Sequence, residues 1–392
     1  MQRKAPTGPI VAITLIVALM TSAACADSDA GDPPAAAPSA THSGHGAASP
    51  PPSPAPLRAG ERFVNLTMPQ AYQPVAPSGG TDEYRCFVVD PKLTSAAYLT
   101  GSQFLPQNTD IVHHAIFFRV SAENAAQTRT LDERSPGAGW QCFGDSGIEG
   151  DGAWVAHWAP GANEVLLASD LGYPMSPGSL LVMQVHYNLL ATEGKPGGKD
   201  QSSVRLRLAD GSSKRRPLDT YQVAAPVELP CTAEESGKLC DRDAAVADVI
   251  HRFGDEARSS VDELSTWCHK GKPTPGSTQH CDYPLEGPST LYATAGHMHL
   301  LGRSIKMELN PGTPTARTLL DLPVYNFDEQ AIRPLAEPVQ VKRGDIIRVT
   351  CTHDAGLRKQ LPALRDTPAR YVVWGDGTSD EMCLGLAIAS AE

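Results

Sequence analysis

After residue 60 the chain consists of short runs in which apolar and polar side chains alternate. Residues 204–208 (VRLRL) and 305–309 (IKMEL) are two such runs. A period of two puts successive side chains on opposite faces of a strand. Glycine and proline, 34 of each, punctuate the runs as turn residues do. The pattern predicts half-buried antiparallel strands and an all-β fold, with two tandem antiparallel β-sandwiches of jelly-roll type.

The length of the chain is compatible with two domains. Of the 392 residues, about 330 remain after the first sixty, which is enough for two cores. A polar, proline-bearing stretch at residues 214–219 is the predicted boundary. We therefore expect an N-terminal domain at 61–215 and a C-terminal domain at 216–392.

One segment departs from the β pattern, between residues 241 and 267. Apolar side chains recur there at helical spacing, interrupted by Gly254. They are Val246, Val249, Ile250, Phe253, Ala257, Val261 and Leu264. The spacing predicts a helical insertion, within residues 231–281, in the second domain.

The first residues follow the plan of an export signal. Basic Arg3 and Lys4 precede an apolar run at 10–20 and three small residues before Cys25. The apolar run is too short for a membrane-spanning helix. We expect residues 1–24 to be a signal peptide and Cys25 to be the lipidated first residue of a lipoprotein on the outer side of a bacterial membrane. The alternative is simple cleavage and secretion.

Residues 25–60 are rich in Ala, Pro, Ser and Gly and predict a disordered tether, in which His42 and His45 are solvated. The formal net charge is −11 and no long basic run occurs, which argues against nucleic-acid binding. Contact with a membrane is expected through the lipid alone. We expect the protein to be a monomer.

The cysteines indicate an oxidising compartment. Nine cysteines less Cys25 leave eight, an even number that predicts four disulfides. No Cys-x-x-Cys pair occurs, which disfavours a thiolate zinc cluster. Four cysteines bracket the helical insertion, and their three possible pairings remain open. They are Cys231, Cys240, Cys268 and Cys281.

Six potential soft-metal ligands occur at four places in predicted strands. They are His113, His114, His186, His297, His299 and Met382. Imidazole binds copper, iron or zinc, and an added thioether shifts the preference toward copper, especially Cu(I). The set therefore predicts copper.

Strand geometry divides these ligands into two groups. His297 and His299 emerge on the same side of a strand and can chelate one ion. His113 and His114 point to opposite faces of a flat strand, so joint binding requires a bulge, a bend or different ring nitrogens. His186 could complete that second site. The alternative for both groups is ordinary polar packing on a strand face.

The order and context of these residues resemble the copper type II, ascorbate-dependent monooxygenases, which include the peptidylglycine α-hydroxylating enzyme and dopamine β-monooxygenase. The resemblance covers roughly residues 84–388 and keeps the order of every motif. The motifs are Tyr84-Arg85-Cys86, Val112-His113-His114, Gln184-Val185-His186-Tyr187, the run HMHLLGR at 297–303, and Asp380-Glu381-Met382-Cys383.

The resemblance implies two copper ions per chain, one on each wall of an open, solvated cleft between two β-sandwiches. An electron-transfer copper would be held by His113, His114 and His186. The copper that meets dioxygen and substrate would be held by His297, His299 and Met382. Disulfides Cys86–Cys142 and Cys351–Cys383 are also implied. The implied reaction hydroxylates a C–H bond with dioxygen and two electrons from an external donor such as ascorbate.

The sequence departs from the family at the substrate pocket. Peptidylglycine enzymes carry an arginine that binds the peptide carboxylate where this chain has Ala295. Leu384 and Leu386 stand where those enzymes carry Asn and Tyr, and Tyr84 is expected to line the cleft or to be a packed aromatic. Without a charge-assisted donor a carboxylate loses its main attraction. We therefore expect a small apolar or aromatic substrate.

Several neighbouring residues have weaker assignments. Gln184 and Tyr187 flank a ligand and either orient imidazoles or serve as strand residues. His157 could approach copper but is predicted to be structural. Asp380 and Glu381 are expected to orient the backbone rather than to perform acid–base chemistry. The remaining histidines are assigned to surface or polar packing. They are His251, His269, His280 and His353.

Three functions compete on these observations. The first is an exported copper monooxygenase, the second a copper-binding or delivery protein on the same scaffold, and the third a structural β-sandwich module. Two copper sites favour catalysis, because a carrier needs only one. A copper store would also be expected to carry dense Met and His repeats, which are absent from the sequence.

Overall fold

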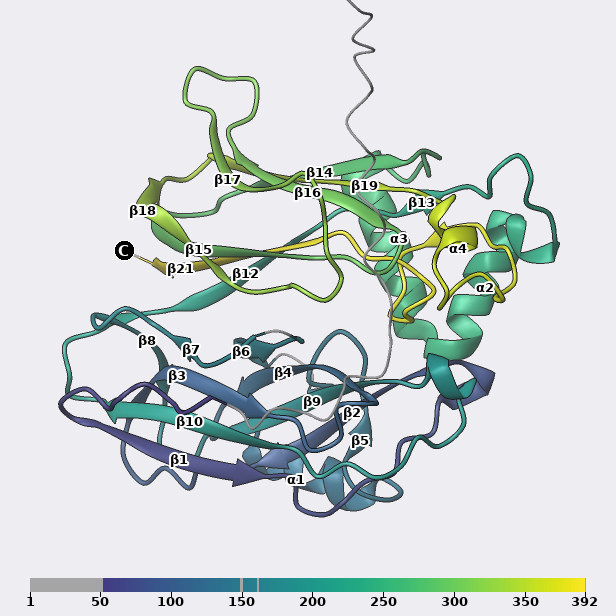
Figure 1. Ribbon diagram of the computed structural model, residues 1–392. Helices are drawn as coiled ribbons and strands as arrows, with labels where there is room; N and C mark the ends of the chain where they lie inside the picture. The colour runs from purple at the N-terminus through teal and green to yellow at the C-terminus, as the bar shows by residue number, and fades with distance from the viewer. Residues whose placement is uncertain (1–51, 149–150, 161, 392) are drawn as a thin grey trace, which may run out of the picture. The chain divides into compact units, whose positions relative to one another are not determined.

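The computed structural model describes residues 52–148, 151–160 and 162–391. The predicted signal peptide, Cys25, His42, His45 and most of the predicted tether lie outside these residues. The described part of the chain is dominated by antiparallel strands, so the all-β prediction is confirmed (Figure 1). Within this part, no helix is long and apolar enough to cross a membrane.

Strands up to residue 217 form two sheets that pack as the first sandwich. One has the order β5-β2-β9-β4-β6, and the other β1-β10-β3-β8-β11 with β7 paired to β3. The strands are β1 (Glu61–Thr67), β2 (Asp82–Val89), β3 (Ala97–Leu105), β4 (Val112–Val120), β5 (Trp140–Gln141), β6 (Ala153–Trp158), β7 (Val165–Leu166), β8 (Leu171–Met175), β9 (Leu180–Asn188), β10 (Ser203–Asp210) and β11 (Arg216–Pro217). The short helices are η1 (Pro77–Gly79), α1 (Ala125–Arg134) and η2 (Leu190–Thr192).

Later strands form the second sandwich from two four-stranded sheets, β12-β21-β15-β18 and β14-β19-β16-β17, with a separate pair β13-β20. The strands are β12 (Asp219–Ala224), β13 (Glu228–Leu229), β14 (Thr278–Pro284), β15 (Ser289–His297), β16 (Gly302–Leu309), β17 (Arg317–Leu322), β18 (Arg333–Val341), β19 (Ile346–His353), β20 (Val372–Val373) and β21 (Leu384–Ala391). The helices are η3 (Lys238–Cys240), α2 (Arg242–Phe253), α3 (Asp255–His269) and α4 (Leu357–Gln360). Strand pairing passes from the first sandwich to the second between Pro217 and Asp219.

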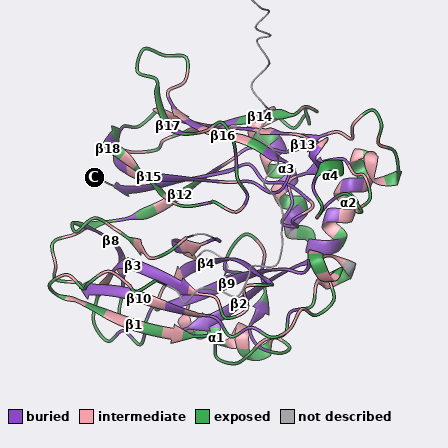
Figure 2. Cartoon of the chain, viewed as in Figure 1, coloured by how far each residue is buried: buried purple, intermediate pink, exposed green. Residues whose placement is uncertain are grey.

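Burial explains why the sequence pattern differs between strands. Strand β9 is buried at every position because both of its faces are covered (Figure 2). Strand β16 instead alternates, with Ile305, Met307 and Leu309 buried. The alternation predicted for residues 305–309 is thus confirmed.

The helical insertion is present and breaks where expected. Helices α2 and α3 flank Gly254, whose φ of 85° lies in the left-handed region that favours glycine. Asp241 begins α2 by accepting the backbone N–H of Ala244. Four predicted apolar positions are buried against β20 and Tyr371. They are Val249, Phe253, Ala257 and Val261.

All eight cysteines in the described residues pair. Cys86–Cys142 and Cys351–Cys383 are the two pairs that the resemblance implied. Cys231 pairs with Cys240 and Cys268 with Cys281, so each end of the insertion is closed by a short loop.

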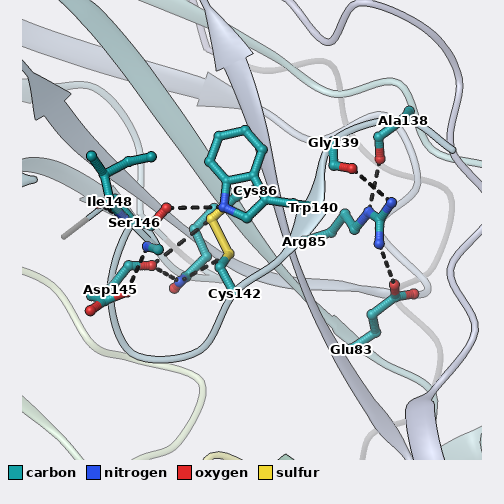
Figure 3. The surroundings of a disulfide bond; sticks show 12 residues. Glu83, Arg85, Cys86, Ala138, Gly139, Trp140, Cys142, Asp145, Ser146 and Ile148 are labelled. Atoms are coloured by element: carbon teal, nitrogen blue, oxygen red, sulfur yellow. Dashed lines mark hydrogen bonds and ion pairs between the residues drawn. A yellow bond between two sulfur atoms is a disulfide. The ribbon is translucent and has the colours of Figure 1, made fainter. Parts of the chain in front are cut away.

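The Cys86–Cys142 disulfide attaches β2 to the loop that follows β5 (Figure 3). The same loop is held by Trp140, whose indole N–H donates to the Ser146 carbonyl. Beside the disulfide, Arg85 donates to the carbonyls of Ala138 and Gly139. These contacts fix the start of the 142–146 loop, which forms part of a cavity wall described below.

The two sandwiches make direct contacts with each other and also leave a cavity between them, so the expected cleft is only partly open. Ile116 and Trp154 of the first sandwich share one buried cluster with Ala295, Leu384 and Leu386 of the second. Burial of apolar surface favours direct packing over a solvated gap.

Candidate metal centres and their cavity

Three histidines of the first sandwich converge. His113 and His114 lie on β4 and His186 on the neighbouring β9, and potential ligand atoms of all three lie within 4.8 Å of one another. The pairing of β4 with β9 shifts register between Val112 and His114. That irregularity supplies the bulge that adjacent histidines require in order to face one site.

The δ nitrogens of these histidines face each other. Nδ1 of His114 lies 3.1 Å from Nδ1 of His113 and 3.4 Å from Nδ1 of His186. On its other side His186 donates from Nε2 to Asp82 Oδ1 at 2.9 Å. That bond places the proton on Nε2 and leaves the Nδ1 lone pair directed at the cluster, the arrangement that commonly orients metal-bound imidazoles.

Tyr84 completes the wall of this cluster. Its ring stacks on His186 with centroids 4.1 Å apart, and its hydroxyl donates to the Asp376 carbonyl of the second sandwich. The residue is buried. Tyr84 is therefore both packed and adjacent to the predicted site.

His297 and His299 lie at and just beyond the end of β15, with ring centroids 5.1 Å apart. Nδ1 of His297 donates to Gln330 Oε1, and Nδ1 of His299 donates to the Asp380 carbonyl. The Gln330 amide is oriented because its Nε2 donates to the Phe327 carbonyl. Both imidazoles therefore carry their proton on Nδ1 and have Nε2 available as a ligand atom.

Met382 precedes β21, the strand that pairs with β15. Glu381 accepts the backbone N–H groups of His299 and Leu301, which ties the methionine loop to the histidine turn. The adjacent Cys383 is bonded to Cys351 of β19. Met382 and His297 line the same cavity.

The two histidine clusters lie in contact with each other. The rings of His114 and His297 are 5.5 Å apart between centroids. Phe327 of the second sandwich stacks on His113 at 4.3 Å and meets His299 edge-on at 6.3 Å. No protein layer separates the two clusters.

A cavity of about 430 Å³ opens beside them, a volume typical of small-molecule sites. Residues of both sandwiches and of α3 line it, including all four predicted pocket residues. These are Tyr84, Ala295, Leu384 and Leu386. Further aromatic walls come from Phe143, Trp154, Trp158 and Trp374. Among its described lining residues none is Lys or Arg, whereas Asp145 and Asp376 are present.

Burial favours the neutral form of three of these imidazoles, those of His114, His186 and His297. Desolvation, reinforced by the neighbouring histidines, holds the pKa of His114 well below its usual value. Desolvation and His299 lower the pKa of His297 to about 3. Desolvation also lowers the pKa of His186, opposed by Asp82. Metal ligation requires the neutral form of histidine, and the lowered pKa values keep these three side chains in that form at pH 7.

The donor sets fit copper. Nε2 of His299 is buried and has no hydrogen-bond partner among the described residues, which is costly unless a metal or water takes it up. Three imidazoles suit Cu(II) or Cu(I), and two imidazoles with a thioether suit Cu(I). A copper held by either set of three ligands would have a coordination position left for another ligand.

Sequence reasoning missed the partners that orient these ligands. Asp82, Gln330 and Phe327 carry no motif signal, because their roles arise from long-range packing. His353, assigned to surface or polar packing, is buried with Nε2 3.2 Å from the Met382 carbonyl. The available signal for His353 was its position two residues after Cys351, whose disulfide with Cys383 anchors the Met382 loop.

The contacts of Gln184, Tyr187 and His157 show where these residues lie relative to the site. Gln184 donates to the Asp145 carbonyl and Tyr187 to Asp200, so the described hydrogen bonds of neither reach a ligand imidazole. His157 lines the cavity, with Nε2 3.3 Å from the Gln330 carbonyl. It lies outside the three-histidine cluster.

His157 gives a pH-dependent prediction for the metal-free protein. Desolvation, opposed by the Gln330 carbonyl, lowers its pKa to about 4, whereas an unfolded histidine has a pKa of about 6.5. Between these values the unfolded chain binds a proton that the folded chain does not, so stability is lost as pH falls through this window. We expect the urea unfolding free energy of His157→Gln to fall less steeply between pH 6 and 4.5, by about 1.4 kcal/mol per pH unit. Equal slopes in both proteins would contradict this.

Comparison with known proteins gives a family for part of the chain. Residues 274–386 match the copper type II ascorbate-dependent monooxygenase, C-terminal domain. The comparison with curated proteins gives no match. Among solved structures, the major capsid protein P2 of bacteriophage PM2 is 7% identical over 84% of this chain and 98% of its own, with a TM-score of 0.29. An allantoicase structure is 11% identical over 81% of this chain and 90% of its own, with a TM-score of 0.17. These structural similarities are too low to support any argument about function.

Proposed function

We propose that this chain is an exported copper monooxygenase, because residues 274–386 match the C-terminal domain of the copper type II, ascorbate-dependent monooxygenases. It hydroxylates a C–H bond of a small apolar or aromatic substrate. The observation that carries the proposal is the placement of both histidine clusters and the Met382 loop beside one cavity with apolar and aromatic walls.

The overall reaction consumes one C–H bond, one dioxygen, two electrons and two protons, and yields one alcohol and one water. Copper, when bound, supplies one-electron storage at each site and dioxygen activation at the site with methionine. Ascorbate or a similar reductant is the proposed electron donor. Two sites match the two electrons that each turnover requires.

The side chains of the protein prepare this chemistry in three ways. Asp82 holds the His186 proton on Nε2, and Gln330 holds the His297 proton on Nδ1, so the ligand nitrogens stay available. Contact between the rings of His114 and His297 gives electrons a short route between the clusters. Leu384 and Leu386 present apolar surface to a substrate in the cavity.

The lining predicts discrimination by charge. With Asp145 and Asp376 and no Lys or Arg among the described lining residues, a carboxylate would meet repulsion without a compensating cation. For an aryl-alkyl amine, amide and carboxylate of matched size, we expect kcat/KM for the carboxylate to be at least about tenfold lower, which is about 1.4 kcal/mol.

Oxygen uptake with ascorbate, followed by mass analysis of the product made under ¹⁸O₂, tests the function. One labelled oxygen atom in the product supports the proposal. Two bound coppers without substrate-dependent uptake across the panel would favour a copper carrier. A carboxylate that is the best substrate would overturn the proposed pocket chemistry.

Export, lipidation of Cys25, the two-domain division and a monomeric state also remain parts of the proposal. Intact-mass analysis of the mature protein tests the first two directly. A diacylglycerol-sized increment on a chain that begins at Cys25 is the expected result.

A further inference from the structure

The first histidine cluster belongs to the first sandwich, but two of its contacts come from the second. Phe327 stacks on the His113 ring at 4.3 Å with the planes 15° apart. Thr378 donates its hydroxyl to Asp82 Oδ1.

Asp82 accepts hydrogen bonds from both sandwiches at this site. Its Oδ1 accepts both the Nε2–H of His186, at 2.9 Å, and the hydroxyl of Thr378, while Oδ2 accepts from Thr81 at 2.9 Å. Asp82 is 1% exposed and Thr378 is 0% exposed. With no room for solvent to replace a lost donor, the carboxylate orientation depends on these three bonds.

Thr378 lies four residues before Met382, on the loop that joins β20 to β21. Arg252 of the insertion holds the same loop through Asp380, with N–O distances of 2.7 Å. One short segment therefore reaches the orienting carboxylate of the first cluster and carries the methionine of the second.

We propose that Thr378 is a positioning residue for the electron-transfer copper, and this inference rests on the proposed function. Thr378 belongs to the second sandwich and acts on the site in the first sandwich through Asp82. It fixes the carboxylate that fixes the His186 ring. The copper affinity of the first site is then set in part by docking of the second sandwich against the first. Removing an orienting partner of a metal-bound histidine typically costs 10- to 100-fold in affinity. Thr378 acts through Asp82, so we expect about tenfold.

The test is a competitive copper titration of the full chain against chelators of graded affinity. Thr378→Val and Thr378→Ala both remove the hydroxyl, and Thr378→Ser keeps it. We expect Val and Ala to weaken one of two sites about tenfold and Ser to bind as the wild type does. Thr128→Val is the matched control, because Thr128 is equally buried but donates to the carbonyl of Asn124, the residue that precedes α1.

Copper X-ray absorption identifies the weakened site. If the first site empties first, the sulfur scattering per bound copper rises, because the remaining copper is the one with methionine. The inference is overturned if the wild type binds two coppers and both hydroxyl-free variants retain both affinities. It is also overturned if the sulfur scattering falls instead. A wild type that binds no copper would overturn the proposed function itself.

Discussion

Replacing Met382 by leucine should abolish hydroxylation while the first copper stays bound. Leucine approximates the shape of methionine, and such exchanges usually cost less than about 1.5 kcal/mol, so the fold should survive. Leucine has no thioether, so the soft ligand that favours Cu(I) is lost. We expect turnover to fall at least about 100-fold, measured as ascorbate-dependent oxygen uptake, with one copper per chain retained at chelator concentrations that spare the wild type.

Met307→Leu is the matched control. Met307 is fully buried in the core of the same sandwich and faces Val349 across β16 and β19. A general effect of methionine loss would appear in both variants. Unchanged turnover in Met382→Leu would refute the ligand assignment.

Replacing Arg252 by methionine should destabilise the protein by about 3–5 kcal/mol. Its guanidinium forms a bidentate pair with Asp380, and the two side chains are 8% and 1% exposed. Burial alone would raise the pKa of Asp380, but Arg252, with help from Arg370, holds it below the usual value. Removing Arg252 leaves a buried carboxylate with only Arg370 and the backbone N–H of Gly377 as hydrogen-bond partners. Because Arg370 remains at 3.0 Å, the low end of the range is expected.

The same variant should disturb the second metal centre, because the Asp380 carbonyl accepts the His299 Nδ1 proton. Urea unfolding of the metal-free protein measures the first effect, and copper titration the second. Arg348→Met is the control: its bidentate pair with Asp282 has side chains 32% and 41% exposed, so a loss of at most about 1 kcal/mol is expected. Equal losses for the two variants would show that burial of the Asp380 pair does not matter.

Periodicity was sufficient to predict the main elements of the fold. Alternation at 305–309 and helical spacing around Gly254 are local signals, and the structure has a strand and two helices there. Strand geometry also predicted that His113 and His114 need a bulge, a bend or different ring nitrogens to share one ion, and the strand pairing shifts register there. The pairing of the insertion cysteines could not be predicted, because several connectivities satisfy the same spacing.

The orienting partners of the site could not be read from the sequence. Asp82 and Thr378 are 296 positions apart, and their bond exists only because two sandwiches dock. The family resemblance led to an open cleft, whereas direct contacts such as that between the His114 and His297 rings leave only a cavity between the sandwiches. Such contacts depend on how the side chains of the two folded sandwiches fit together, and the periodicity of the sequence does not predict this fit.

The most direct test of the two-copper account is the copper content of the purified, copper-loaded chain, measured with the sulfur contribution to copper X-ray absorption. The account predicts two coppers per chain, of which one has a methionine sulfur ligand and the other has none. In His186→Ala the copper content should fall to one per chain, and the remaining copper should keep its sulfur ligand. One copper or none in the wild type would contradict the account, as would two coppers without a sulfur ligand.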